Sequence, residues 1–219
     1  MIRKLIIAPW FGPLPSYYKL WVNNIGRLAP HGYHIYGTFD KEDFNRRVKA
    51  ALGIENAIGD DGRKVCDYRC TFGVIYADLI EKGSFDFWGT TDVDMVYGRV
   101  EEWVTDDFLA DIDLHSNHPT YVSGPWSLYR NTPPVNELFM HYEDWRGELG
   151  NPRTTGWVET SFSRLLEDSL LGYSYTNWQT KNLDNFDRLH WDGDKLMEGR
   201  DEVMVAHFRR TKEYPKGLL

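Results

Sequence analysis

The chain has 219 residues, a length that favours one domain rather than two. Hydrophobic residues make up 42% and charged residues 26%, which is ordinary globular usage and excludes a coiled coil, a collagen-like chain or a largely disordered one. The net charge of −8, from 25 Lys and Arg against 33 Asp and Glu, excludes an overall basic field that would draw the chain to nucleic acid or anionic lipid.

The aromatic content is high, at 15% with 9 Trp and 13 Tyr. Aromatic rings mostly pack cores but also stack on sugars and bases, so the excess raises the expectation of ligand binding only slightly. Cys66 and Cys70 are too few for a disulfide framework and lack histidines at ligand spacing, which favours two reduced thiols. No apolar stretch approaches the roughly 18 residues of a membrane span, and Pro9 interrupts the short apolar run near the start, unlike in a signal peptide. We therefore expect a cytoplasmic protein.

Predicted strands and helices alternate along the chain, and no internal repeat or long linker interrupts them. In chain order, the pattern predicts a strand over residues 5–8, a helix over 14–28, a strand over 33–39, a helix over 72–80 that Gly83 ends, a strand over 85–90 and a helix over 100–108. It then predicts a strand over 121–129, a helix over 133–142 with Thr132 as its cap, a helix over 158–170 that Gly172 closes and a last strand over 203–208. This alternation favours an α/β fold with a mainly parallel sheet flanked by helices, whose ligand crevice lies at the carboxyl ends of the strands.

Two acidic residues, Asp92 and Asp94, follow the strand predicted over 85–90. In an extended chain, residues two apart point to the same face, so both carboxylates can enter one volume at a strand end. A divalent cation would relieve their repulsion, and carboxylate oxygens suit Mg²⁺ and Mn²⁺, which keep positions open for phosphate oxygens. Such a pair also occurs by chance on solvated loops. The apolar flanks, including Trp88 and Val96, favour the metal site, because an exposed loop has no need of them.

The run Trp-Gly-Thr-Thr-Asp-Val-Asp-Met-Val-Tyr-Gly at residues 88–98 resembles the Asp-x-Asp motif of glycosyltransferases with the GT-A fold. It is especially similar to a group of small bacterial and viral proteins described as glycosyltransferases, many of them linked to capsular polysaccharide. Four further blocks resemble that group in the same order, at residues 10–21, 64–73, 123–131 and 207–212. The group often has Lys-Pro where this chain has Arg69-Cys70, and the chain is shorter than many relatives. The resemblance nevertheless covers almost the whole chain.

The resemblance implies a Rossmann-like GT-A fold and transfer of a sugar from a nucleotide-diphosphate donor, with a UDP-sugar favoured and Mn²⁺ or Mg²⁺ as the cofactor. The implied metal ligands are Asp92, Asp94 and His207, although a histidine at this place can also belong to the edge of the core. The nucleotide would be held by Asp40, Asp67, Arg69 and Arg130, and its diphosphate by Arg209, Arg210 and Lys212. Asp40 can equally cap a turn, and the last three residues can equally form a solvated basic tail.

Two mechanisms remain open for such a transferase. An inverting enzyme needs a carboxylate base opposite the leaving group, for which Glu159 is the first candidate and Asp144 the second, beside Asp94 in the catalytic centre. A retaining enzyme needs no such base, and Glu159 would then only orient the sugar. Since an acidic residue near the start of a helix also favours the helix dipole, a purely structural role for Glu159 is the alternative.

We expect a single domain over residues 1–219, with a nucleotide-binding half over about 1–100 and an acceptor and metal-completing half over about 101–219. The expected acceptor is a glycan or another hydroxyl compound; a modified nucleic-acid base is conceivable but not favoured by the negative charge. Two other classes stay open. A metal-dependent phosphohydrolase or nuclease should carry more acidic or histidine ligands for a second metal, and a sugar-binding module would leave the acid pair unused. The sequence does not predict the oligomeric state.

Overall fold

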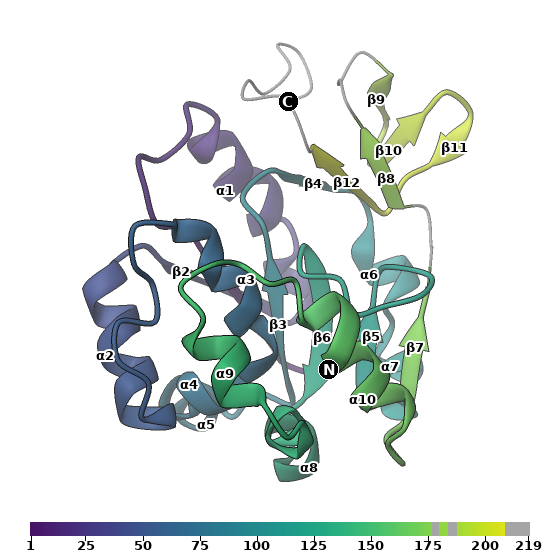
Figure 1. Cartoon of the computed structure of the whole chain (residues 1–219). Coiled ribbons are helices and arrows are strands. Elements are labelled where there is room, and N and C mark those ends of the chain that lie inside the picture. Colours follow the sequence, from purple (N-terminus) through teal and green to yellow (C-terminus); the bar gives the residue numbers. More distant parts are fainter. Residues whose placement is uncertain (177–179, 184–187, 209–219) are drawn as a thin grey trace.

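The computed structural model describes residues 1–176, 180–183 and 188–208, and its centre is a six-stranded sheet (Figure 1). The strand order is β2 (Tyr33–Thr38), β1 (Lys4–Pro9), β3 (Phe87–Thr91), β6 (Trp126–Arg130), β5 (Leu114–Ser116) and β7 (Tyr173–Tyr175). β1 pairs in parallel with β2 and β3, and β5 pairs in parallel with β7, while β6 is antiparallel to both of its neighbours. The expectation of a mainly parallel mixed sheet is therefore confirmed.

Helices lie on both faces of this sheet (Figure 1). One face packs against α2 (Lys41–Leu52), α3 (Val65–Tyr68), α4 (Phe72–Ile75), α5 (Ala77–Lys82), α8 (Pro133–Asn136), α9 (Trp145–Gly150), the π-helix η5 (Val158–Phe162) and α10 (Ser163–Glu167). The 3₁₀ turns η3 (Arg69–Thr71) and η4 (Leu138–His141) pack against the same face, and the 3₁₀ turn η2 (Gly62–Lys64) precedes α3. The other face packs against α1 (Tyr18–Gly26), α6 (Val100–Trp103) and α7 (Asp106–Ala110), and the 3₁₀ turn η1 (Ala29–His31) follows α1.

The central strand β1 contributes to both cores. Its residues Leu5 and Ile7 pack into the first core, and Ile6 and Ala8 pack into the second. Successive side chains of a strand point to opposite faces, so a strand covered on both faces has a continuous apolar run. This is why residues 5–8 were recognisable as a strand.

Two three-stranded sheets lie beyond the carboxyl ends of β1 and β3, at the top of Figure 1. The first has the order β4 (Met95–Tyr97), β12 (Val205–Phe208) and β8 (Thr180–Leu183), with β12 antiparallel to β4 and parallel to β8. The second has the order β11 (Asp201–Glu202), β10 (Lys195–Glu198) and β9 (Leu189–Asp192), and both of its pairings are antiparallel. The first sheet matters for the site, because it joins the segment after β3 to the C-terminal part of the chain.

The sequence analysis did not predict α2, although its signals are present. The Asp40 carboxylate accepts hydrogen bonds from two backbone N–H groups of the first turn, at 2.9 and 3.1 Å, and so caps the helix. Gly53 ends the helix with a left-handed φ of 71°. The buried face consists of Phe44, Val48 and Leu52 at four-residue spacing.

Several predicted elements are shorter or interrupted in the structure. The strand predicted over 121–129 is formed only where β6 covers it, because Pro125 has no N–H for a ladder. The helix predicted over 14–28 begins at Tyr18, after two prolines. Three other predicted helices are interrupted or irregular. The helix predicted over 72–80 divides at Tyr76 into α4 and α5, and the helix predicted over 133–142 divides into α8 and η4, without a capping hydrogen bond from Thr132. The helix predicted over 158–170 begins as the π-helix η5. Within the described ranges, no helix combines the length and apolar character needed to cross a bilayer.

Candidate functional site

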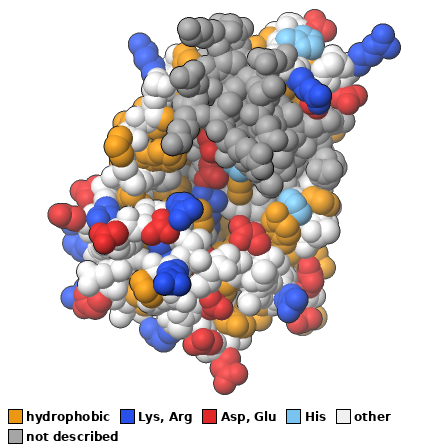
Figure 2. All heavy atoms as spheres, turned by 45° about the horizontal axis from the view of Figure 1, so that its top comes forward, with side chains coloured by type: hydrophobic (Ala, Val, Ile, Leu, Met, Phe, Trp, Pro, Cys, Tyr) orange, Lys and Arg blue, Asp and Glu red, His pale blue; other side chains and the backbone are white. Residues whose placement is uncertain are grey.

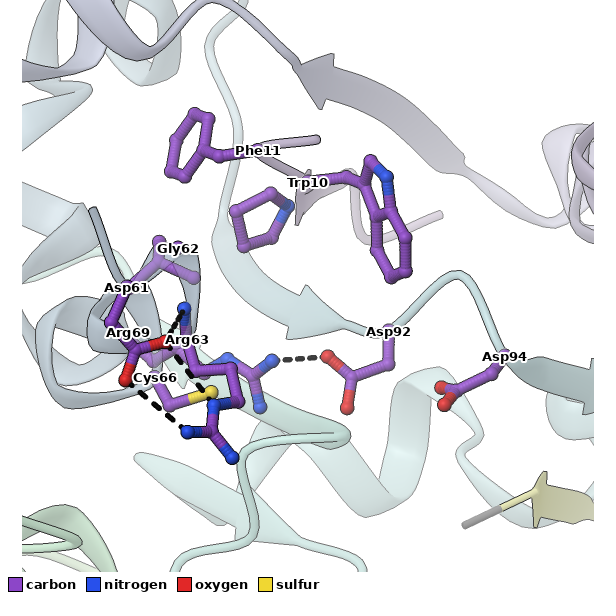
Figure 3. Close-up of a pocket in the computed structure, with 11 residues that line it drawn as sticks. Trp10, Phe11, Asp61, Gly62, Arg63, Cys66, Arg69, Asp92 and Asp94 are labelled. Atoms are coloured by element: carbon purple, nitrogen blue, oxygen red, sulfur yellow. Dashed lines mark hydrogen bonds and ion pairs between the residues drawn. The ribbon is translucent and has the colours of Figure 1, made fainter. Parts of the chain in front are cut away.

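Asp92 and Asp94 lie in the turn that joins β3 to β4, at the carboxyl end of β3 (Figure 3). Val93 between them is buried and belongs to the core that contacts α1. The sequence analysis assumed an extended strand here, whereas the structure has a turn whose middle residue is anchored in the core. Their carboxylates nevertheless enter one volume.

Strand β12 brings a histidine to this acid pair. In the antiparallel pairing of β12 with β4, His207 lies opposite Met95. Nε2 of His207 is 3.6 Å from Oδ1 of Asp94 and 3.9 Å from Oδ2 of Asp92. One possible ligand atom from each of the three residues lies within 4.8 Å of the others. The structure thus brings together the three residues that were predicted as metal ligands.

The two acids differ in their contacts, because Arg69 donates a hydrogen bond to Asp92, whereas Asp94 has an oxygen without a hydrogen-bond partner in the described part of the chain. Burial and the neighbouring charge of Asp92 raise the pKa of Asp94 to about 7. Oδ1 of Asp94 is buried and accepts no hydrogen bond from the described part of the chain. Buried carboxylate oxygens normally have a hydrogen-bond partner, so this atom is a candidate ligand atom for a cation.

A divalent cation fits this donor set. Two carboxylates and one imidazole are ligand types that Mn²⁺ accepts, and Mg²⁺ accepts the carboxylates. A cation would give Oδ1 of Asp94 a closer partner than Nε2 of His207, which is 3.6 Å away, and would offset the repulsion between the two acids. Ligands from outside the protein, such as phosphate oxygens, would complete its coordination.

Arg69 binds the acid pair from the other side, because its Nη2 donates to Oδ1 of Asp92 (Figure 3). Arg69 is 4% exposed, and Gly124 leaves room for it: a Cβ on Gly124 would lie 2.0 Å from Nη1 of Arg69. Although burial opposes the charge, the Asp92 carboxylate raises the pKa of the Arg69 guanidinium. Arg69 therefore remains a cation and holds one oxygen of Asp92 in place.

A pocket of about 410 Å³ opens beside the acid pair (Figure 3). Figure 2 shows acidic, basic and histidine side chains close together near the middle of the face that carries it. A second hollow of about 220 Å³ adjoins it through Phe11 and Gly62, and is also lined by Phe39 and Lys41. The first pocket is lined by Pro9, Trp10, Phe11, Asp61, Gly62, Arg63, Val65, Cys66, Arg69, Asp92 and Asp94.

Trp10, Phe11, Asp61 and Arg63 are among the pocket residues to which the sequence analysis assigned no role. Trp10 and Phe11 directly follow β1, so the rule that ligands bind at the carboxyl ends of strands could have found them. Asp61 and Arg63 belong to the turn before α3, where no motif distinguishes them. Nε of Arg63 is 3.2 Å from Oδ1 of Asp61, and the Arg63 side chain is 85% exposed, so it is free to reorient toward a ligand.

Glu159 lies near Arg69 but does not line this pocket. It is half-buried in η5, and a Cβ built on Gly156 would lie 3.3 Å from its Oε2. Burial raises the pKa of Glu159, the charge of Arg69 lowers it and the charge of Asp92 raises it. The structure therefore places Glu159 within electrostatic reach of the acid pair.

Two predicted nucleotide-binding residues are engaged elsewhere. The Asp67 carboxylate is buried and accepts hydrogen bonds from Lys64 and from the backbone of Thr155 and Gly156. Arg130 pairs with the first residue of β3, because β6 runs antiparallel to β3, and so lies at the opposite end of the sheet from Asp92. There its guanidinium donates to the carbonyl groups that end α7. The structure does not bring either side chain to the pocket.

The remaining predicted residues are placed as follows. The Asp40 carboxylate caps α2, between two residues that line the smaller hollow. Asp144 is exposed at the start of α9 and does not line the pocket. Arg209, Arg210 and Lys212 lie outside the described residues.

Comparison with known proteins gives a family and a fold. Residues 34–188 match the family model described as a family of unknown function, DUF6625. No curated protein sequence matches the chain. The chain is similar to the crystal structure of a glycosyltransferase involved in the glycosylation of the major capsid of PBCV-1, with 12% identity, a TM-score of 0.60 and coverage of 96% of this chain and 95% of that one. It is also similar to mouse xyloside xylosyltransferase 1 in its apo form, with 8% identity, a TM-score of 0.50 and coverage of 98% and 99%.

At these identities the two structures establish the fold alone. The fold is the GT-A type of α/β fold, as the resemblance of the sequence motifs implied. The family rests on the sequence match itself, which covers well over half of the chain. The protein belongs to the DUF6625 family.

Proposed function

We propose that this protein is a metal-dependent glycosyltransferase that transfers a sugar from a nucleotide-diphosphate donor to a hydroxyl acceptor. The observation that carries the proposal is the cluster of Asp92, Asp94 and His207 at the carboxyl end of β3, beside a pocket of about 410 Å³. The GT-A type of fold supports the proposal, because its similar structures include glycosyltransferases.

Asp92, Asp94 and His207 would hold Mn²⁺ or Mg²⁺, which supplies positive charge to a leaving diphosphate. Trp10 and Phe11 give the pocket an apolar wall for the nucleoside. Such a wall keeps water away from the diphosphate, and this strengthens every charge interaction there. We keep uridine as the first base to test, and Arg209, Arg210 and Lys212 as proposed diphosphate ligands outside the described residues.

Arg69 would add a fixed positive charge beside the metal ligands. Its guanidinium is already neutralised in part by Asp92, so its main effect is to leave Asp92 one oxygen for the metal. Arg63 would bind the donor more loosely, because its side chain is largely exposed.

The proposed acceptor is a glycan or another hydroxyl compound. We do not propose a nucleic-acid acceptor, since the chain carries a net charge of −8. We also do not propose a two-metal phosphohydrolase, because Asp92, Asp94 and His207 form the one metal-suited cluster among the described residues.

Glu159 is the proposed base if the enzyme inverts the anomeric centre. Its pKa is raised by burial, which suits a group that accepts a proton from a hydroxyl near neutral pH. Glu159→Gln should then lower turnover by about 10²-fold or more and leave nucleotide affinity unchanged. If the product keeps the donor's anomeric configuration and Glu159→Gln is nearly as active as the wild type, Glu159 is not the base.

The proposal is tested by thermal-shift measurements with a panel of nucleoside diphosphates and nucleotide sugars, each with and without Mn²⁺. We expect one base to stabilise the protein in a metal-dependent way, because binding to the native state alone raises the melting temperature. Asp92→Asn serves as the control that should remove the metal dependence. The proposal fails if no nucleotide stabilises the wild type with or without the metal.

A further inference from the structure

The buried pair Lys64 and Asp67 contacts the segment that leads to Glu159. Nζ of Lys64 donates to Oδ2 of Asp67 at 2.8 Å, to the carbonyl of Glu148 at 2.7 Å and to the carbonyl of Arg153 at 3.2 Å. Neither Lys64 nor Asp67 is exposed to solvent. Lys64, the last residue of η2, thus ties Asp67 of α3 to the end of α9 and to the loop that follows it.

Asp67 binds the same loop a few residues later in the chain, at Thr155, Gly156 and Trp157. Its Oδ2 accepts from the backbone N–H of Thr155 at 2.8 Å, and its Oδ1 accepts from the backbone N–H of Gly156 at 3.0 Å. Its carbonyl accepts from Nε1 of the buried Trp157 at 2.7 Å. Residues 151–156 have no helix or strand of their own, so these bonds supply the partners that regular structure would otherwise provide.

Glu159 lies directly against this loop. Gly156 has a left-handed φ of 70°, and a Cβ at this position would lie 3.3 Å from Oε2 of Glu159. The carboxylate of Glu159 therefore lies over the residue whose N–H is held by Asp67. The helix α3, which carries Asp67, continues into η3, and the first residue of η3, Arg69, binds Asp92.

We propose that Lys64 and Asp67 are positioning residues that hold residues 153–159 against α3, so that Glu159 is kept in a fixed place relative to Arg69 and Asp92. This inference rests on the proposed function for the role of Glu159, but the contacts themselves do not depend on it. It also assigns Asp67 a role other than nucleotide binding. Buried ion pairs contribute to conformational specificity in some proteins, and a loop without regular structure is a place where such specificity is needed.

The contacts are tested by hydrogen–deuterium exchange in Lys64→Met. We expect exchange of the amides in residues 153–159 to become about tenfold faster or more, since hydrogen bonds to a charged group are lost or weakened. Lys4→Met is the matched control: Lys4 is also buried and ion-paired, but it binds Asp106 near the amino end of β1. It should leave residues 153–159 unchanged. Equal exchange at 153–159 in the wild type and Lys64→Met, or equal acceleration in both variants, overturns the inference.

The double variant Lys64→Gln/Asp67→Asn is measured alongside, because it leaves no unpaired buried charge if Lys64→Met does not fold. It should also accelerate exchange at 153–159, and wild-type protection there overturns the inference.

The functional part is read from kinetics with the nucleotide sugar that the wild type uses. We expect Lys64→Met to lower kcat about tenfold with the donor KM unchanged, and Lys4→Met to change neither. A loss of donor affinity in Lys64→Met would show instead that the pair serves the nucleotide. If the wild type binds no nucleotide, the proposed function fails, while the exchange data still decide whether the pair holds the loop.

Discussion

Two acidic regions, the buried Asp67 and the partly buried pair of Asp92 and Asp94, differ in how their charges are satisfied. At Asp67, both carboxylate oxygens accept hydrogen bonds, and Lys64 supplies the compensating charge. At Asp94, one carboxylate oxygen is buried without a hydrogen-bond partner among the described residues, and the pKa is raised to about 7. The first region is complete within the protein, whereas in the second Nε2 of His207 is 3.6 Å from this oxygen, beyond hydrogen-bond distance.

This difference separates a structural acid from a candidate ligand. Both residues are aspartates of sequence blocks that resemble glycosyltransferases, so residue type and motif do not distinguish them. The hydrogen-bond partners do, because a buried carboxylate that lacks a partner raises the free energy of the native state until a cation or a proton is bound. The following predictions test this contrast in order of expected effect.

The largest expected effect is on catalysis. Asp92→Asn should lower turnover of the nucleotide sugar by about 10³-fold, because a metal ligand contributes several kcal/mol to the stabilisation of the transition state. The variant should keep its fold, as checked by circular dichroism, and should lose its response to Mn²⁺. Full activity of the wild type in the presence of a chelator would contradict the assignment.

The second effect is on stability at the completed region. Lys64→Met should lower the free energy of unfolding by about 3 to 5 kcal/mol, because it leaves the Asp67 carboxylate buried without a compensating charge. Urea unfolding monitored by fluorescence measures this change. Lys4→Met should cost less, because its partner Asp106 is 43% exposed and can return to water. A change below about 1 kcal/mol in Lys64→Met would mean that the pair is not stabilising.

The third effect is a pH dependence of the metal-free protein. Native Asp94 keeps its proton to about pH 7, whereas the unfolded chain releases it near the ordinary value of 3.8. The native state thus binds more protons in this window, and its stability falls as pH rises from about 4 to about 7. Asp94→Asn should remove this dependence and be more stable than the wild type above pH 7, by on the order of 2 kcal/mol. Added Mn²⁺ should make the wild type the more stable of the two proteins, because only the wild type keeps both carboxylates for the metal. If the free energies of unfolding of the two proteins change with pH in the same way, Asp94 is ionised throughout this pH range.

The smallest effect concerns the exposed cation of the pocket. Arg63→Ala should weaken binding of UDP with Mn²⁺ about fivefold and leave the stability of the protein nearly unchanged, because the side chain is largely exposed. Arg46→Ala is the control, since Arg46 is also exposed and paired with a nearby aspartate but belongs to α2 and does not line the pocket. Calorimetry of both variants decides whether Arg63 contacts the nucleotide. Equal affinities would remove Arg63 from the site.

Much of the fold could be predicted because its signals are local. The apolar run at residues 5–8 becomes a central strand covered on both faces, and the aromatic and apolar residues before Asp92 become β3. The sequence analysis missed α2, although the sequence contains both its cap at Asp40 and its apolar residues at four-residue spacing. The break at Pro125 could also have been predicted, since proline cannot donate to a ladder.

The candidate site, like the fold, has a part that the sequence predicts and a part that it does not. Asp92 and Asp94 are two residues apart, so sequence spacing alone suggested that they share one volume, and the ends of β1 and β3 indicated the edge at which a ligand would bind. These conclusions require only the geometry of a few neighbouring residues.

Tertiary structure decided the rest, because it depends on which strands pair and in which direction. His207 reaches the acid pair only because β12 pairs with β4, more than a hundred residues earlier in the chain. Arg130 is carried to the far end of the sheet because β6 runs antiparallel to β3. Asp67 became a structural acid because a distant loop supplies its hydrogen bonds. No local pattern encodes such partners, since the free energy of burying a charge depends on every group that surrounds it after folding.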